Sequence, residues 1–317
     1  MCVVVSHASI LSEECCTWEL SAPRLSFVSS TLVLCGLLTA QAPGFGRDLA
    51  NIKADGVIRH LGVPYANFVT GSDDGMDVEL IKGFAKSIGV RYEYVKTDWG
   101  QVVEDLVGRK VTNTSNGRAV LGEDVPVRGD LVANGFTMLP WRMDILEFSE
   151  PTFPSQIWLI SRANSSAKPI KPSKNIQKDI DLVRKLVRDK AVLALPKTCL
   201  DPTLYNLAET GAIINNHNGN LNEMAPALIS KEAEFTILDV PDALIALEKW
   251  PGKIKIIGPM SPPQLMAVGF PKSAPKLREA FNRYLQEIKQ NGEYARLIKR
   301  YYPTVSYYFP GFFKNFN

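Results

Sequence analysis

Arg142 stands between two apolar stretches of the chain, in the segment GFTMLPWRMDILEFSEP of residues 135–151. A guanidinium is a permanent cation whose planar donors match a carboxylate through two parallel hydrogen bonds. From these residues alone, a surface ion pair with Asp144 or Glu147 is the simpler interpretation of Arg142, and binding of an anion is the alternative.

The sequence offers few residues for metal binding or for nucleophilic catalysis. Four of the five cysteines lie in the first forty residues: Cys2, Cys15, Cys16 and Cys35. Cys199 remains, and a thiol near the start of a helix can have a lowered pKa, but a nucleophile also needs a base. The three histidines are scattered: His7, His60 and His217. We therefore predict no catalytic residue, no metal site and no cofactor.

Length and charge limit the class of protein. The 317 residues are 45% hydrophobic and 22% charged, which is typical of a soluble chain with about two domains. The formal charge of +3, from 36 basic and 33 acidic residues, is too small to indicate binding to nucleic acid.

The first 42 residues have the pattern of a signal peptide. Residues 25–40 are uncharged and largely apolar, Arg24 precedes them, and Ala40-Gln41-Ala42 follows the pattern of a cleavage site. A membrane anchor is the alternative, but these 16 residues are fewer than the ~20 needed to span a bilayer. Acidic residues ahead of Arg24 are atypical, and a misassigned start site is one explanation. We expect export to a bacterial periplasm, with cleavage after Ala42.

The rest of the chain alternates between strand and helix patterns, which indicates an α/β fold. Strands are expected at 57–63, 90–95, 130–138, 156–162, 191–195, 212–215, 234–238 and 254–257. Helices are expected at 76–88, 99–107, 176–188, from about 201, 221–229, 240–247, 274–290 and 293–301. Residues 110–129 are polar and turn-rich, as in a hairpin or a loop.

A connector rich in Pro, Ser and Lys at 164–174 indicates that the chain leaves one lobe and builds another. The apolar strand at 254–257 is where we expect it to return. We therefore assign residues 43–161 and 257–317 to lobe 1 and residues 162–256 to lobe 2.

Several motifs, in order, resemble those of one protein family. GMDVELIKGFAKSIGV is followed about sixty residues later by NGFTMLPWRMDILEFSEPTF. The two segments resemble the type II periplasmic solute-binding proteins, in the group that supplies amino acids to ABC importers (bacterial extracellular solute-binding proteins, family 3). The matching positions are Gly75, Asp77, Glu79 and Leu80, then Thr137 and Arg142, then Phe148, Ser149 and Pro151. With later motifs, the resemblance covers residues 55 to about 303.

The resemblance implies a two-lobed α/β protein in which each lobe is a mixed sheet flanked by helices, with a ligand cleft between the lobes. It implies a monomer that captures a small solute, closes by a hinge motion and delivers the solute to a membrane ABC permease. It also implies that Arg142 binds the carboxylate of an amino acid or a related solute. Asp77 and Glu79 are then expected to be structural.

Further ligand-binding positions follow from the resemblance: Gly135, Thr137, Thr198, Asp239, Tyr65, Phe68 and Trp99. Thr137 would add a hydroxyl or backbone contact, Thr198 would present the start of a helix to the anion, and Asp239 would bind an ammonium. The aromatic residues would line the ligand side chain. The alternatives are that Asp239 and Thr198 only cap helices, and that the aromatic residues belong to the core.

The sequence departs from the family pattern directly before the arginine. Leu139 replaces the second threonine of T-x-T, and Pro140 and Trp141 stand where polar or acidic residues are usual. One hydroxyl is thereby lost near the carboxylate site, so a less polar, aromatic or non-amino-acid carboxylate becomes more plausible.

Two other classes of function remain open. Dehydratases on this scaffold need a general acid/base carboxylate, for which Glu209 and Glu223 are candidates. Murein transglycosylases carry a catalytic domain after a similar module, and this sequence ends at Asn317. A sensor module normally shares its chain with a transmembrane span. We expect binding without bond chemistry.

Overall fold

The computed structural model describes residues 46–71, 73–113 and 118–314, so the predicted signal peptide lies outside the described residues. The elements below all belong to residues 41–317, one of the two units into which the chain divides. Within this described part, no helix combines the length and the apolarity that a membrane span requires.

The first sheet is mixed and has the strand order β2-β1-β5-β14-β6. β1 (Val57–Gly62) runs parallel to β2 (Arg91–Lys96) and to β5 (Leu131–Val132). β14 (Gly269–Pro271) is antiparallel to β5 and to β6 (Leu146–Phe148). The helices of this lobe are α1 (Leu49–Asp55), α2 (Met76–Ser87), α3 (Val102–Val107), α4 (Pro140–Ile145), α8 (Pro275–Gln290) and α9 (Glu293–Tyr301).

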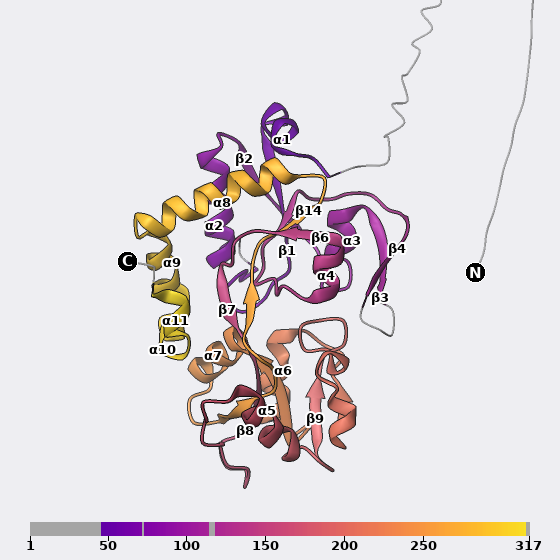
Figure 1. Cartoon of the computed structure of the whole chain (residues 1–317), viewed down its shortest axis with the longest axis vertical. Helices are drawn as coiled ribbons and strands as arrows, with labels where there is room; N and C mark the ends of the chain where they lie inside the picture. Colours follow the sequence, from indigo (N-terminus) through magenta and orange to yellow (C-terminus); the bar gives the residue numbers. More distant parts are fainter. Residues whose placement is uncertain (1–45, 72, 114–117, 315–317) are drawn as a thin grey trace, which may run out of the picture. The chain divides into compact units, whose positions relative to one another are not determined.

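The C-terminal helices complete this first lobe although they are distant from it in sequence. α8 and α9 both contact α2, as Figure 1 shows. Apolar residues at helical spacing explain the contact, because Phe281 and Tyr284 of α8 pack against Phe84 of α2. The short elements α10 (Val305–Tyr308) and α11 (Pro310–Phe313) follow.

The second sheet is also mixed, with the order β10-β9-β11-β8-β12. β9 (Ala191–Ala194) is parallel to β10 (Ile213–Asn216) and β11 (Phe235–Asp239), whereas β8 (Ile157–Arg162) is antiparallel to β11 and β12 (Ile254–Pro259). α5 (Ile176–Lys185), α6 (Met224–Ile229), α7 (Val240–Lys249) and three short 3₁₀ turns belong to this lobe. The α/β class and the two lobes expected from the sequence are therefore confirmed.

The chain connects the two sheets twice, and the two connecting segments pair with each other. β7 (Phe153–Ser155) leads into β8, β13 (Gln264–Met266) follows β12, and the two short strands pair antiparallel. Because β8 and β12 both pair within the second sheet, each of these strands belongs entirely to the second lobe. The exact lobe boundaries remain a prediction, and the β7–β13 ladder is the natural place for them.

Some elements differ from those expected from the sequence, because glycine, proline and asparagine impose turns there. The strand expected at 130–138 ends at Val132, because Gly135 has a left-handed φ of +65° and Pro140 opens α4. The helix expected from about 201 is two 3₁₀ turns, Pro202–Tyr205 and Leu207–Thr210, separated by Asn206 with φ +46°. The described parts of the 110–129 stretch form a hairpin of β3 (Arg109–Asn113) and β4 (Ala119–Asp124).

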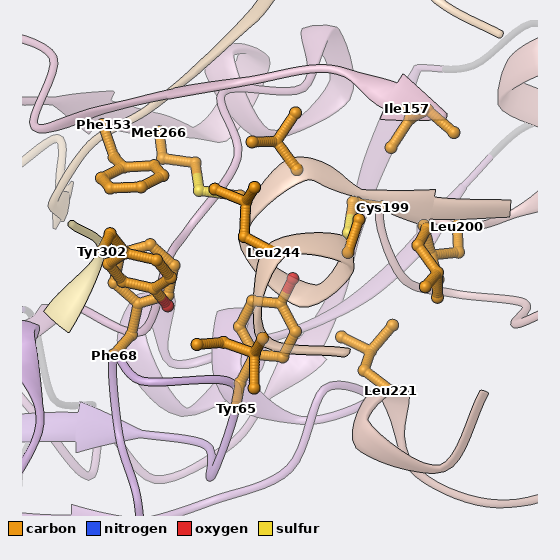
Figure 2. Packing of buried hydrophobic residues seen from close by; sticks show 14 of the residues in the cluster. Tyr65, Phe68, Phe153, Ile157, Cys199, Leu200, Leu221, Leu244, Met266 and Tyr302 are labelled. Atoms are coloured by element: carbon orange, nitrogen blue, oxygen red, sulfur yellow. The ribbon is translucent and has the colours of Figure 1, made fainter. Parts of the chain in front are cut away.

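Aromatic packing dominates the core between β1 and the C-terminal helices. Phe68 lies 5.1 Å from Phe153 and 5.0 Å from Tyr302, measured between ring centroids. Figure 2 shows these rings beside Tyr65, whose hydroxyl oxygen lies on the side of Cys199. Residues from both lobes therefore meet within a single apolar cluster.

Candidate ligand-binding site

The segment between β5 and α4 is built around Gly135. Its φ of +65° is accessible to glycine, and a Cβ at this position would collide with the ring of Phe68. The Gly135 N–H donates to Asp77 Oδ2 at 2.7 Å, so α2 fixes the course of this segment. The geometry gives both Gly135 and Asp77 a structural role beyond the carboxyl end of the central strand β5, and ligand binding by Gly135 remains a prediction.

Arg142 lies in the single turn and a half of α4, which begins at Pro140. Its guanidinium carbon is 4.1 Å from the centre of the Phe136 ring and 5.2 Å from that of Trp141. Nη1 donates to the carbonyl of Thr137 at 2.9 Å. The cation is thus held against aromatic faces and one backbone oxygen of its own segment.

Arg142 is only 1% exposed, and burial lowers its pKa to about 10. It still carries a charge at neutral pH. None of the ion pairs found among the described residues includes Arg142, and Glu147 instead faces Arg278 at 3.8 Å. The surface ion pair considered from the sequence is therefore wrong. The buried Nε also has no hydrogen-bond partner in the described structure.

Two residues from the second lobe act electrostatically on Arg142. The Cys199 thiol and the Tyr205 phenol both raise the pKa of the guanidinium, against the larger effect of burial. Tyr205 donates its hydroxyl hydrogen to the Cys199 carbonyl. The start of α4 borders this part of the second lobe, because Leu139 and Pro140 line one pocket with Tyr205.

Asp239 ends β11 and caps α7. Its Oδ1 accepts hydrogen bonds from the Tyr65 hydroxyl and, at 3.4 Å, from the Asp242 N–H, and its Oδ2 lies 3.4 Å from the Cys199 sulfur. Burial raises the pKa of Asp239 to about 6. The helix-capping role weighed from the sequence is therefore present, and the ammonium-binding role remains a prediction.

Cys199 does not have the environment of a nucleophile. It is 4% exposed, and burial together with the charge of Asp239 raises the pKa of its thiol well above the ordinary value. A thiol that stays protonated is a weak nucleophile. The structure gives no support to cysteine catalysis.

The two threonines are engaged locally. The Thr198 hydroxyl donates to the Leu195 carbonyl at 2.8 Å and accepts from the Leu200 N–H at 3.0 Å, so it stabilises its own turn. The Thr137 carbonyl accepts from Arg142 and from the Leu139 N–H, and its backbone bridges to Met266. Both hydroxyl-bearing residues are buried.

The three aromatic candidates separate into two environments. Phe68 is fully buried among core rings. Tyr65 is also buried, but its hydroxyl reaches Asp239, and its ring makes an edge contact with Trp99 at 5.7 Å. Trp99 is partly buried and packs against both apolar clusters. Of the three, Tyr65 is the one with a hydrogen bond to a candidate ligand-binding residue, and the rings of Phe68 and Trp99 both pack against it.

Sequence reasoning missed Asn134 and Tyr205. Asn134 lies two residues after the end of β5, is 0% exposed, and has no hydrogen-bond partner for either amide atom in the described structure. A buried amide normally finds partners, so this one points to a functional position. An amide inside an otherwise apolar run was the available signal. Tyr205 gave no such signal, because only the folded chain brings it near Arg142.

A pocket of about 340 Å³ lies beside the start of α4. Its lining is Leu139, Pro140, Gln177, Ile180, Arg184, Leu204, Tyr205, Asn206, Met260, Ser261, Pro262 and Gln264. Leu139 and Pro140 belong to the segment that carries Arg142, and Tyr205 acts on its pKa. The pocket therefore borders the segment that carries Arg142, although Arg142 itself is not one of its lining residues.

The carboxylates considered for an enzyme lie elsewhere. The side chain of Glu209 is 71% exposed and 4.0 Å from Arg184. Glu223 is 53% exposed and lines a separate pocket of about 400 Å³ with His217 and Glu232. Over the described ranges, no cluster of three or more His, Cys, Asp or Glu side chains has a metal-binding arrangement.

Sequence comparison finds a family and a distant relative. Residues 127–304 match the model of the bacterial extracellular solute-binding proteins, family 3. A membrane-bound lytic murein transglycosylase F of Desulfosudis oleivorans is 24% identical over 231 residues, which are 73% of this chain and 44% of that protein. The chain thus spans less than half the length of this relative.

Solved structures share the fold at low identity. A mutant of ArgBP from T. maritima aligns with a TM-score of 0.63 and 19% identity, over 80% of this chain and 99% of that one. An ancestral amino acid-binding protein, a precursor of cyclohexadienyl dehydratase, gives 0.61 and 19%, over 80% and 98%. The GluR0 ligand-binding core from Nostoc punctiforme, in complex with L-glutamate, gives 0.59 and 18%, over 77% and 99%.

Proposed function

Because the chain belongs to the bacterial extracellular solute-binding proteins, family 3, we propose that it captures a small carboxylate-bearing solute, an amino acid or a relative, through Arg142. The protein would work as a periplasmic monomer, close its lobes over the solute by bending at the β7–β13 ladder, and deliver it to an ABC permease. Members of this family are typically extracellular or periplasmic, and the fold neighbours include amino-acid-binding proteins.

One observation carries the proposal: Arg142 is a buried cation with no carboxylate partner among the described residues and with an unsatisfied Nε. Burying an unpaired charge costs several kcal/mol. A ligand carboxylate would supply the missing counter-charge and accept the Nε–H. Binding of the ligand would therefore remove the free-energy cost of the unpaired buried charge.

An enzyme on the same scaffold is the rival function, since the comparisons include a murein transglycosylase and a dehydratase precursor. Such chemistry needs a carboxyl group that can exchange a proton with substrate. Glu209 and Glu223 are exposed and do not line the pocket beside α4, and Asp239 already accepts hydrogen bonds from Tyr65 and Cys199. We therefore propose binding without bond chemistry.

The test is a thermal-shift screen of the purified protein against amino acids and small carboxylates. A ligand at 100 times its Kd adds about 2.7 kcal/mol to the free energy of unfolding. In Arg142→Met, the shift should disappear, whereas the melting temperature without ligand should stay the same or rise, because an unpaired buried charge is replaced by an apolar chain of similar length.

Arg162→Met is the matched control. Arg162 donates to the carbonyls of Leu228 and Ala233, so its loss should lower the melting temperature and leave the ligand-induced shift intact. The absence of a shift with every carboxylate, or an undiminished shift in Arg142→Met, would contradict the proposal.

A further inference from the structure

We propose that residues 305–313 form a strap that stabilises the closed arrangement of the two lobes, through the ring of Tyr308 against Trp158. The strap comprises α10 and α11 and follows residue 304, the last residue matched by the family model. This inference rests on the hinge closure of the proposed function, but it does not depend on the identity of the ligand. A chain of contacts runs from the first lobe, past the β7–β13 ladder, to the second sheet.

Tyr302 anchors the strap to the first lobe. It is buried, and its hydroxyl accepts a hydrogen bond from the Asn67 N–H at 3.0 Å. Its ring lies 5.0 Å from that of Phe68 and 4.7 Å from that of Phe153 in β7, measured between centroids (Figure 2). Val305, the first residue of α10, is also fully buried. The apolar core therefore holds the start of the strap in place.

The other end of the strap reaches the second lobe. The ring of Tyr308 lies 5.2 Å from that of Trp158, which belongs to β8 of the second sheet. Trp158 Nε1 donates to Gln156 Oε1 at 2.9 Å, and Gln156 Nε2 donates to the Ser261 carbonyl at 2.9 Å. Gln156 lies between β7 and β8, and Ser261 lies between β12 and β13. The strap therefore contacts a side chain that is hydrogen-bonded to both connections between the sheets.

The aromatic contact at the end of the strap occurs in an arrangement in which the lobes are closed. The Tyr65 hydroxyl of the first lobe donates to Asp239 of the second. The Ala66 N–H likewise donates to Asn222 Oδ1 at 3.0 Å. Bending at the β7–β13 ladder would carry Trp158 away with the second sheet, whereas the strap would stay with the first lobe. A contact made in only one of two states stabilises that state, so the strap favours closure before any ligand binds.

The contact is weak enough to break when the lobes open. Tyr308 is 46% exposed, so the contact is made at the surface of the molecule. An aromatic pair of this kind changes a conformational equilibrium by ~2- to 10-fold. A contact of this size raises the closed population and still permits opening for release of a solute.

Amide hydrogen exchange of the ligand-free protein, followed by NMR, tests the strap. The Ala66 N–H is bonded to Asn222 of the other lobe, so its exchange rate reports how often the lobes part. In Tyr308→Ala, this exchange should be ~2- to 10-fold faster than in the wild type. Tyr308→Phe keeps the ring and should exchange like the wild type. Tyr307→Ala is the matched control, because Tyr307 is 82% exposed and its loss should leave the exchange unchanged.

Equal exchange of the Ala66 N–H in Tyr308→Ala and in the wild type overturns the inference. An unprotected Ala66 N–H in the wild type also overturns it, because the ligand-free lobes would then not be closed. Faster exchange in Tyr308→Ala, but not in Tyr307→Ala or Tyr308→Phe, supports the strap. The proposed function fails separately, in the thermal-shift screen with carboxylates, because the exchange of Ala66 is measured without any ligand.

Discussion

Four buried residues of the site have pKa values shifted by burial in the direction that favours the neutral form. The pKa is lowered for Arg142 and raised for Cys199, Asp239 and Asp77. The shifts have different consequences at neutral pH. Arg142 stays charged at a pKa of about 10, and the Cys199 thiol stays protonated. Asp77, at about 7, is divided between its two forms. At neutral pH the site therefore combines a charged Arg142 with Asp239, whose pKa of about 6 leaves it mainly ionised.

Asp77 should make stability depend on pH. Its pKa is near 3.8 in the unfolded chain and about 7 in the folded protein, so the folded state holds the proton over that range. The free energy of unfolding should fall as pH rises from about 4 to 7, by up to about 4 kcal/mol for three pKa units. Urea unfolding across this range measures it, and Asp77→Asn should flatten the slope. Equal slopes in the two proteins would contradict this assignment.

The sequence predicted individual site residues only at positions that match the motifs of the family. That pattern singled out Arg142, Thr137 and Asp239, and all three are buried near the meeting of the lobes. The apposition of Tyr65 and Asp239, which are 174 positions apart, depends on tertiary packing that no local pattern records. The same holds for Tyr205, whereas Asn134 could have been noticed as an amide within an otherwise apolar run.

The short connections position the site more than the long helices do. α4 is six residues long, yet its opening proline and the left-handed Gly135 before it direct Arg142 onto the ring of Phe136. Periodicity predicted the long helices α8 and α9 well, because their apolar faces repeat over several turns. Periodicity predicted too long a strand at 130–138, because a run of apolar residues in an irregular buried segment has the same sequence pattern as a buried strand.

Gly135→Ala tests the importance of that segment. The left-handed conformation costs a residue with a side chain about 1–2 kcal/mol, and the collision with Phe68 adds to this cost. Gly56→Ala is the control, because Gly56 has φ +68° and nothing within 4 Å of an added Cβ. Chemical denaturation should show a larger loss for Gly135→Ala, together with weaker ligand binding. Equal losses would show that the close contact with Phe68 has no energetic consequence.

At the scale of the whole described chain, two mixed sheets are joined by the paired strands β7 and β13. The alternation of strands and helices predicted this α/β class, and the motif order predicted the family. The strand order and the position of the crossings depend on long-range pairing, such as that of β14 with β5 and β6, which separate sequence segments do not specify. The proposed hinge closure would take place about this ladder, with Arg142 and Asp239 contributed by different lobes.

The most direct test of the central claim is the NMR resonance of the Arg142 Nε–H group, identified by its loss in Arg142→Lys. This group is buried and without a partner in the described structure. On saturation with a carboxylate that raises the melting temperature, the resonance should move downfield as a charge-assisted hydrogen bond forms. An unchanged resonance in the presence of a bound carboxylate would contradict the account, because the ligand would then be held by other residues.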